Sequence, residues 1–167
     1  MTLVHGFPAV VDDSSHTLIL GSMPGAPSLV AGRYYANPRN SFWPIMGELF
    51  GAGPDQPYPH RLRTLQDNGV ALWDVLKACR RTGSADADIE VRSEVPNDFA
   101  ALYSRHTAIE RVFFNGARAE MAYRRSVVAA GAHPAGVTLA RLPSTSPANA
   151  ATPALAKVDA WRALLER

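Results

Sequence analysis

Two patterns of apolar residues alternate along the chain. Four short runs in which nearly every residue is apolar predict buried strands, at residues 17–20, 70–73, 112–114 and 137–142. Between these runs, apolar residues recur three and four positions apart, as on one face of an amphipathic helix. Strands that alternate with helices predict βαβ units, and therefore an α/β fold in which helices cover both faces of a mostly parallel sheet.

Capping residues mark the ends of several predicted helices. Asn97 is a candidate N-cap for the helix that follows it, and Thr152-Pro153 combines an N-cap with a first-turn proline. The alanine-rich stretch 117–130 has no helix breaker and predicts one continuous helix. Residues 82–94 are polar and predict a surface loop.

The residues that follow the predicted strands have a functional character. In open parallel sheets, ligands bind beyond the carboxyl ends of the strands. This rule gathers residues 21–25, Asp74, Asn115-Gly116 and residues 143–149 along one edge of the predicted sheet. We therefore expect a ligand site at that edge.

The composition is that of a globular protein, with 47% hydrophobic and 19% charged residues, and we expect a single domain, residues 1–167. The one cysteine excludes a disulfide framework and a cysteine-rich metal site, and the five histidines are dispersed. We therefore expect neither a metal nor a cofactor. No apolar run reaches the roughly 20 residues of a membrane span and no signal-peptide pattern opens the chain, so we expect a cytoplasmic protein without membrane contact.

Arginine dominates the basic residues. The formal net charge is only +2, but 15 of the 17 basic residues are Arg. The guanidinium group binds phosphates bidentately and stacks on flat rings better than the ammonium group of Lys does. This composition permits nucleic-acid binding, although a bias in genome composition explains it equally well.

The first predicted strand leads directly into Gly21-Ser22-Met23-Pro24-Gly25. Glycine has no side chain, so such a turn brings the backbone close to a ligand. Turns of Gly and Pro also follow many strands that bind nothing. The segment lacks the further glycines and the Lys of a phosphate-binding loop or a dinucleotide fingerprint.

Aromatic and amide side chains gather in residues 34–43. Tyr34 and Tyr35 lie in a predicted loop, where one ring can stack on a base while we expect the other to pack beneath the loop. Asn37 precedes a proline and can form a turn, and Asn40 can cap the helix that follows. An amide in this place can also hold a water molecule or the polar edge of a ligand, and the two roles are compatible.

The last predicted strand is followed by a segment of small polar residues and two prolines, residues 143–149. Hydroxyl groups and exposed backbone amides on such a rigid segment suit close contact with DNA phosphates. An ordinary Ser/Pro turn is the alternative explanation.

Taken together, these segments resemble the uracil-DNA glycosylase superfamily, and most of all its branch named for hypoxanthine-DNA glycosylases. The matches run in order through most of the chain, and their joint specificity is high. They are Gly-Ser-Met-Pro-Gly-x-x-Ser-Leu at 21–29, Tyr-Tyr-Ala-Asn-Pro-Arg-Asn-Ser-Phe-Trp at 34–43, Ala-Leu-Trp-Asp-Val at 71–75, Phe-Phe-Asn-Gly at 113–116 and Leu-Pro-Ser-Thr-Ser-Pro-Ala at 142–148.

The resemblance implies a three-layer α/β/α sandwich on a four-stranded sheet. It also implies a monofunctional DNA glycosylase, a monomer that acts on double-stranded DNA with a damaged or mispaired base. In the mismatch-specific uracil and thymine relatives, an Asn in the first motif positions the attacking water, and Met23 stands at that place here. We therefore expect hypoxanthine as the preferred base, ahead of uracil.

The resemblance also implies roles for individual residues. The catalytic amide maps to Asn40, with Asn37 as the alternative. The residues expected to contact the flipped base are Ser22, Met23, Pro24, Gly25, Tyr35, Phe42 and Asn115. The residues expected to contact DNA are Arg39, Ser144, Thr145, Ser146, Pro147, Ala148 and Asn149.

Two other functions stay open. A non-catalytic module that binds nucleotides or DNA would keep the pocket and lack the chemistry, and Met23 in place of Asn favours it. A hydrolase of RNA or of free nucleosides could use the same fold. Incubation with lesion-containing duplexes discriminates among these functions.

Overall fold

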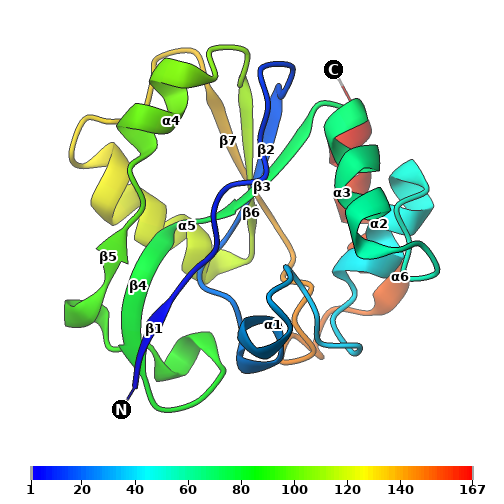
Figure 1. Cartoon of the computed structure of the whole chain (residues 1–167), viewed down its shortest axis with the longest axis horizontal. Helices are drawn as coiled ribbons and strands as arrows, with labels where there is room; N and C mark the ends of the chain where they lie inside the picture. The colour runs from blue at the N-terminus through cyan, green and yellow to red at the C-terminus, as the bar shows by residue number, and fades with distance from the viewer. Residues whose placement is uncertain (1, 167) are drawn as a thin grey trace.

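A four-stranded parallel sheet forms the centre of the computed structural model, which describes residues 2–166 (Figure 1). Its strands lie in the order β3, β2, β6, β7, and each pair of neighbours is parallel. Their bounds are Val70–Asp74, Thr17–Gly21, Arg111–Asn115 and Thr138–Leu142. The four strands predicted from the apolar runs are confirmed to within one residue at each end.

Helices cover both faces of this sheet (Figure 1). One layer consists of α2, α3 and α6, with the bounds Phe42–Phe50, Tyr58–Asp67 and Ala154–Trp161. The opposite layer consists of α4 and α5, with the bounds Phe99–Arg105 and Ala117–Tyr123. The predicted α/β fold and three-layer α/β/α sandwich are confirmed. None of the helices within residues 2–166 is long and apolar enough to cross a membrane.

Successive residues of the central strands belong to different cores. Leu18 and Leu20 pack towards α4 and α5, whereas Ile19 between them packs towards α2 and α6. Strand β6 repeats the arrangement, since Phe114 faces the first core and Phe113 the second. Side chains alternate across a strand, and a strand covered on both faces therefore reads as a continuous apolar run.

A second sheet lies beside the sandwich and was not predicted. It is antiparallel, in the order β1, β4, β5, with the bounds Thr2–His5, Leu76–Arg81 and Val95–Pro96. Strand β4 follows β3 after a single residue and carries charged side chains on its exposed positions. It therefore lacks the apolar run that marks a strand buried on both faces. Residues 82–94, predicted as a loop, contain the short 3-10 helices Asp86–Asp88 and Val91–Ser93.

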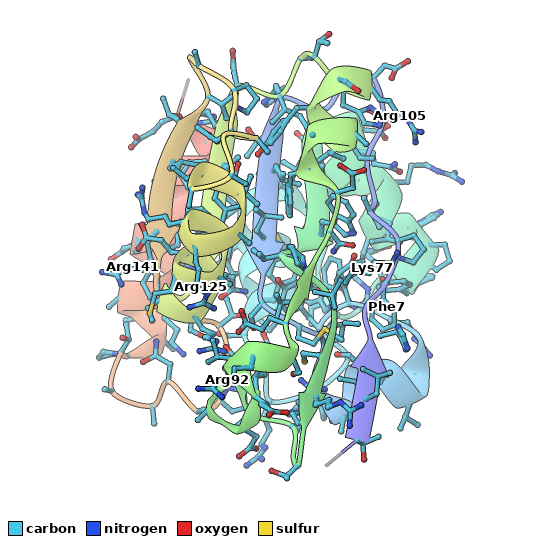
Figure 2. The ribbon with its side chains drawn as sticks, turned by 90° about the vertical axis from the view of Figure 1, so that its left-hand side faces the viewer. Phe7, Lys77, Arg92, Arg105, Arg125 and Arg141 are labelled. Atoms are coloured by element: carbon cyan, nitrogen blue, oxygen red, sulfur yellow. The ribbon has the colours of Figure 1, made fainter. Side chains whose placement is uncertain are left out.

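An ion-pair cluster joins this second sheet to the helical layer. The carboxylate of Glu94, just before β5, binds Arg118 and Arg125, each at 2.5 Å. Figure 2 shows Arg125 on the face turned towards the viewer, with Arg92 and Arg141 on the same side. On the helical layer, Glu120 pairs with Arg124 at 3.2 Å. Several of the arginines that permitted nucleic-acid binding therefore form ion pairs within the protein.

Three helix ends differ from the prediction. The N-cap of α4 is Asp98, whose carboxylate accepts from the N–H of Ala101 at 3.0 Å, while the Asn97 amide donates to the Asp74 carbonyl. Helix α6 begins after Pro153, not after Thr152. The predicted helix 117–130 changes to π-helical geometry at Arg124–Val128, where the Ser126 hydroxyl donates to the Ala122 carbonyl, a bond that competes with the regular helical one.

Candidate active site

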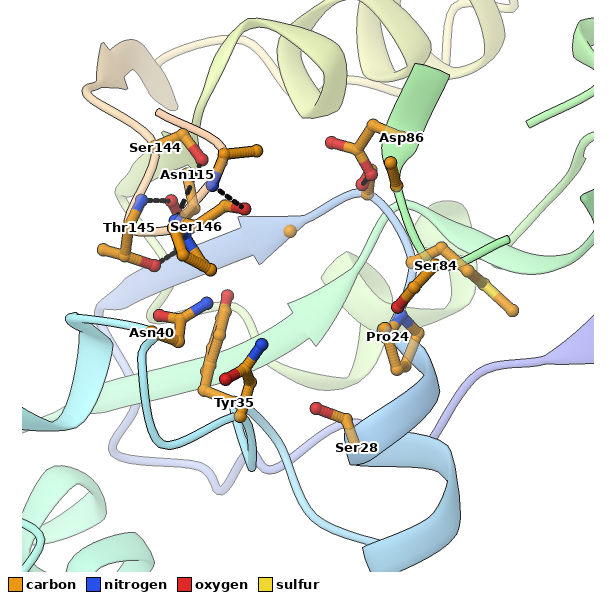
Figure 3. Close-up of a pocket in the computed structure, with 18 of the residues that line it drawn as sticks. Pro24, Ser28, Tyr35, Asn40, Ser84, Asp86, Asn115, Ser144, Thr145 and Ser146 are labelled. Atoms are coloured by element: carbon orange, nitrogen blue, oxygen red, sulfur yellow. Dashed lines mark hydrogen bonds between the residues drawn. The ribbon is translucent and has the colours of Figure 1, made fainter. Parts of the chain in front are cut away.

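A pocket with a volume of about 780 Å³ opens at the carboxyl ends of the parallel strands (Figure 3). Gly21 ends β2, Asp74 ends β3 and Asn115 ends β6, and all three line it. Strands β3 and β6 flank β2 on opposite sides, so the strand order reverses there, and open α/β sheets bind ligands at such a point. The rest of the lining comes from residues in 22–28, 34–40, 84–87 and 144–149.

The pocket brings together every residue proposed for the site except Phe42. It also holds side chains to which no role was assigned, among them Asp74, Ser84 and Asp86. Asp74 stood at the predicted edge, and an acidic residue at the end of an apolar strand is the signal that could have singled it out. The polar stretch 82–94 carries no such signal. Its residues line the pocket only because the folded chain brings Ser84 next to Gly25.

Tyr35 presents an aromatic face to the pocket from a strained backbone. Its φ of 55° is the only positive φ of a non-glycine residue among residues 2–166. Such a conformation costs roughly 1–2 kcal/mol and is common where function demands an unusual geometry. The ring stacks on Phe42, with centroids 3.9 Å apart and planes inclined by 21°.

Phe42 is therefore a support and does not contact a ligand, which corrects its proposed role in base binding. Its side chain is fully buried beneath the Tyr35 ring. Tyr34 is also a structural residue: its hydroxyl donates to the Pro8 carbonyl at 2.9 Å, and its own carbonyl accepts from the Trp43 indole at 2.9 Å. These contacts fix one tyrosine in the protein so that the next one lines the pocket.

The Asn40 side chain is held in place by the helix that it precedes. The side-chain Oδ1 accepts from the backbone N–H of Phe42 at 2.9 Å. The backbone N–H of Asn40 donates to the Asn37 carbonyl, also at 2.9 Å. Because only the oxygen can accept, the bond from Phe42 also determines which amide atom is Nδ2. No partner for Nδ2 is found among residues 2–166, so the group is available to a ligand. Asn40 therefore stabilises the start of α2 and lines the pocket.

Asn37 forms a local turn beside it. Its Oδ1 accepts from the N–H of Arg39 at 3.0 Å, the pattern of an Asx turn. The turn leaves the Arg39 side chain exposed at the rim, with no ion-pair partner within residues 2–166. Both Asn37 and Asn40 line the pocket, but only the Asn40 side chain is bonded to the first residue of α2.

Asn115 and Thr145 bind each other, which gives both side chains a structural role besides their proposed contacts. The Asn115 Oδ1 accepts from the Thr145 N–H and its Nδ2 donates to the Thr145 hydroxyl, both at 2.9 Å. The Thr145 side chain is buried, and its carbonyl accepts from the N–H of Ser41 at 3.0 Å. The pair thus joins the end of β6, the segment after β7 and the start of α2, while both residues line the pocket.

The rest of residues 143–149 forms successive hydroxyl turns. The Ser144 hydroxyl accepts from the N–H of Ser146, and the Ser146 hydroxyl accepts from the N–H of Ala148, each at 3.2 Å. The Asn149 amide closes the segment by donating to the Ser144 carbonyl at 3.0 Å. The segment therefore holds its shape before any ligand arrives, with Ala148 exposed at its tip.

The turn after β2 is held by contacts with buried side chains and presents backbone N–H groups to the pocket. The buried Arg81 guanidinium donates to the Pro24 carbonyl, and the Ser22 hydroxyl donates to Asp86 at 2.5 Å. The Met23 side chain is buried in the core with β4 and α4. Within residues 2–166 no acceptor is found for the N–H groups of Ser22 and Met23, so both are available to a bound molecule.

Gly21 makes room for two functional groups. A Cβ at this position would lie 2.5 Å from Asp74 Oδ1 and 3.2 Å from the Tyr35 hydroxyl. We expect Gly21→Ala to push the carboxyl and the phenol apart and to lower activity strongly, with a loss of stability typical of overpacking, roughly 1–3 kcal/mol. Thermal unfolding and an activity assay of Gly21→Ala check this prediction. Wild-type activity in Gly21→Ala would contradict this close packing.

Comparisons with known proteins match this architecture. A sequence model of the uracil DNA glycosylase superfamily matches residues 8–165. The chain belongs to this superfamily. A hypoxanthine DNA glycosylase of Methanosarcina acetivorans is 41% identical over 115 residues, which make up 68% of this chain and 72% of that protein. One of Methanosarcina barkeri is 38% identical over 112 residues, which make up 66% of this chain and 70% of that protein.

A solved structure extends the likeness over nearly the whole chain. A solution NMR structure from Methanosarcina acetivorans, provisionally assigned as a uracil DNA glycosylase, has a TM-score of 0.78 to this chain and is 34% identical to it. The match covers 99% of this chain and 100% of the other. The resemblance inferred from the sequence motifs is thereby confirmed.

Proposed function

We propose that the protein is a monofunctional DNA glycosylase that flips a deaminated base, hypoxanthine before uracil, out of double-stranded DNA and hydrolyses its N-glycosidic bond in base excision repair. The observation that carries this proposal is the meeting of the Tyr35 ring and the Asn40 amide in one pocket at the sheet edge. Membership in the uracil DNA glycosylase superfamily and two relatives named hypoxanthine DNA glycosylase support it.

Tyr35 would bind the flipped base by stacking. Base–aromatic stacking contributes roughly 1–3 kcal/mol, which offsets part of the few kcal/mol that unstacking a base costs. Phe42 behind the ring and the strained backbone of Tyr35 hold the ring ready, so little conformational entropy is lost on binding. Hypoxanthine opposite thymine is mispaired and is therefore cheaper to flip than a paired base.

Asn40 would orient the attacking water, and the backbone of the first motif would stabilise the departing base. The bond to Phe42 uses one lone pair of Asn40 Oδ1, so the second lone pair and Nδ2 can both reach a water molecule. The free N–H groups of Ser22 and Met23 are preorganised donors for negative charge on the base. Catalysis of this kind rests on positioning and on electrostatic stabilisation.

Arg39 and the tip of residues 143–149 would hold the DNA backbone. Arg39 is exposed at the rim of the pocket, and Pro147 and Ala148 belong to the wall formed by residues 144–149. Ser144 and Ser146 shape that wall through their turns and expose backbone to a phosphate. Because one chain supplies all of these groups, we further propose that residues 1–167 act as one domain, as a monomer in the cytoplasm.

Incubation with defined duplexes tests the function. We expect strand breaks after alkali treatment of a duplex with deoxyinosine opposite thymine, weaker cleavage with deoxyuridine opposite guanine, and none with undamaged DNA. Binding to all three duplexes without abasic product would favour a non-catalytic DNA-binding module. Release of hypoxanthine from free inosine but not from the duplex would identify a nucleoside hydrolase instead.

A further inference from the structure

A buried carboxyl group at the end of a central strand lines the pocket and has no role in the proposed function. Asp74 is buried at the end of β3, with 4% of its surface exposed, and its Oδ2 has no hydrogen-bond partner among residues 2–166. Its Oδ1 and the Tyr35 hydroxyl both face the space left by the missing side chain of Gly21. A buried polar atom without a partner is costly unless a ligand or a proton satisfies it.

The groups around Asp74 favour its neutral, protonated form. Burial raises its pKa to about 7, and the nearby carboxylate of Asp86 adds to this rise. The buried guanidinium of Arg81, from β4, opposes this rise with a smaller effect. The Tyr35 hydroxyl faces the same region, and burial together with the Asp74 charge raises the pKa of this phenol, so it stays neutral.

We infer that Asp74 is the catalytic acid of this pocket, and that its carboxyl group donates a proton to N7 of the flipped purine base. The inference rests on the proposed function and adds the group that assists the leaving base. N7 is the most basic ring nitrogen of a hypoxanthine nucleoside, whereas uracil has no corresponding nitrogen. The acid therefore favours a deaminated purine over a deaminated pyrimidine.

The reaction balances without any further reactant. The C1′–N9 bond breaks and its electron pair stays on N9, while the Asp74 proton passes to N7, so that hypoxanthine leaves neutral. Water forms the new bond to C1′, and the proton that this water loses returns to the Asp74 carboxylate. General acid catalysis of this kind contributes about 100-fold to 10,000-fold in rate.

Single-turnover rates across a range of pH test the inference. In the wild type on a deoxyinosine duplex, we expect the rate to fall above about pH 7 with the loss of one proton, since only the acid form is active. In Asp74→Asn we expect a loss of about 100-fold at about pH 6 and a flat pH profile, because the amide keeps the shape but has no proton to give. A wild-type rate that stays constant through this pH range, or an Asn variant within a few-fold of it, would overturn the inference.

A substrate without N7 separates the acid from a structural role. On a duplex with 7-deaza-2′-deoxyinosine, we expect the wild type to be slow and Asp74→Asn to be no slower. An equal loss on both substrates would mean that Asp74 does not protonate N7. If the wild type cleaves no deoxyinosine duplex at all, the proposed function fails instead, so the two failures are distinct.

Asp86→Asn is the matched variant for the electrostatic environment. It keeps an oxygen to accept the bond from Ser22 but removes the neighbouring negative charge, which lowers the pKa of Asp74. We expect the fall in rate to move to lower pH while the acid remains in place. An unmoved pH profile would show that the titrating group is not Asp74.

Folding gives an independent readout. The folded chain holds the Asp74 proton up to about pH 7, whereas the unfolded chain releases it near the ordinary aspartate pKa of 3.8. The free energy of unfolding of the wild type therefore falls as pH rises between these values. We expect Asp74→Asn to lack this decrease and to match or exceed the wild type in stability at about pH 8, and a variant that is less stable there would contradict the neutral carboxyl.

Discussion

Asn40→Ala is expected to slow base excision from a deoxyinosine duplex by about 100-fold, in line with the loss of one preorganised polar group at a reaction centre. The methyl group of alanine can neither accept from water nor donate to it. The same change removes the bond from the N–H of Phe42 to Oδ1 at the start of α2, and loss of such a hydrogen bond costs about 1 kcal/mol of stability. Single-turnover kinetics and thermal unfolding measure the two effects separately.

Two further variants separate the effect of the Phe42–Asn40 bond on stability from the effect of the amide on the rate. Asn40→Asp keeps an oxygen for the Phe42 N–H and loses the Nδ2 donor, so we expect near-normal stability with a rate far below that of the wild type. Asn37→Ala should weaken the turn at Arg39 and retain most of the rate. A rate for Asn40→Ala within a few-fold of the wild type, together with a large loss in Asn37→Ala, would assign the catalytic amide to Asn37.

Trp161→Ala is expected to cause the largest loss of stability, about 3–5 kcal/mol. The indole is fully buried and packs edge-on against Phe42, with ring centroids 6.0 Å apart. Its Nε1 donates to the Pro143 carbonyl at 2.9 Å. Since globular domains are stable by only about 5–15 kcal/mol, this loss should be plain in chemical denaturation.

Trp161→Phe is the matched control, because it keeps an aromatic ring and loses the bond to Pro143. We expect a smaller loss of stability than in the alanine variant. Residues 143–149 begin at that carbonyl, so we also expect weaker binding to a lesion duplex with a largely preserved rate at saturating protein. Unchanged DNA affinity in a folded Trp161→Phe protein would show that the bond does not position this wall of the pocket.

The sequence alone determined the scaffold and the location of the site. Strands buried on both faces must be continuously apolar, so the four central strands were readable from local composition. The rule that ligands lie beyond the carboxyl ends of parallel strands then placed residues 21–25, Asp74, Asn115-Gly116 and residues 143–149 near one another. Strand β4 was not predicted, because its charged and partly exposed residues do not form the continuous apolar run of a buried strand.

Only the tertiary structure decided what each side chain of the site can do. Asn115 and Thr145 lie 30 residues apart and use their polar groups on each other, and Phe42 lies beneath Tyr35. Burial and the neighbouring carboxylate of Asp86 raise the pKa of Asp74. Asp86 lies in the polar stretch 82–94, whose sequence does not predict that it folds back onto the pocket. Burial and long-range pairing depend on how distant segments pack, and no local spacing of residues records them.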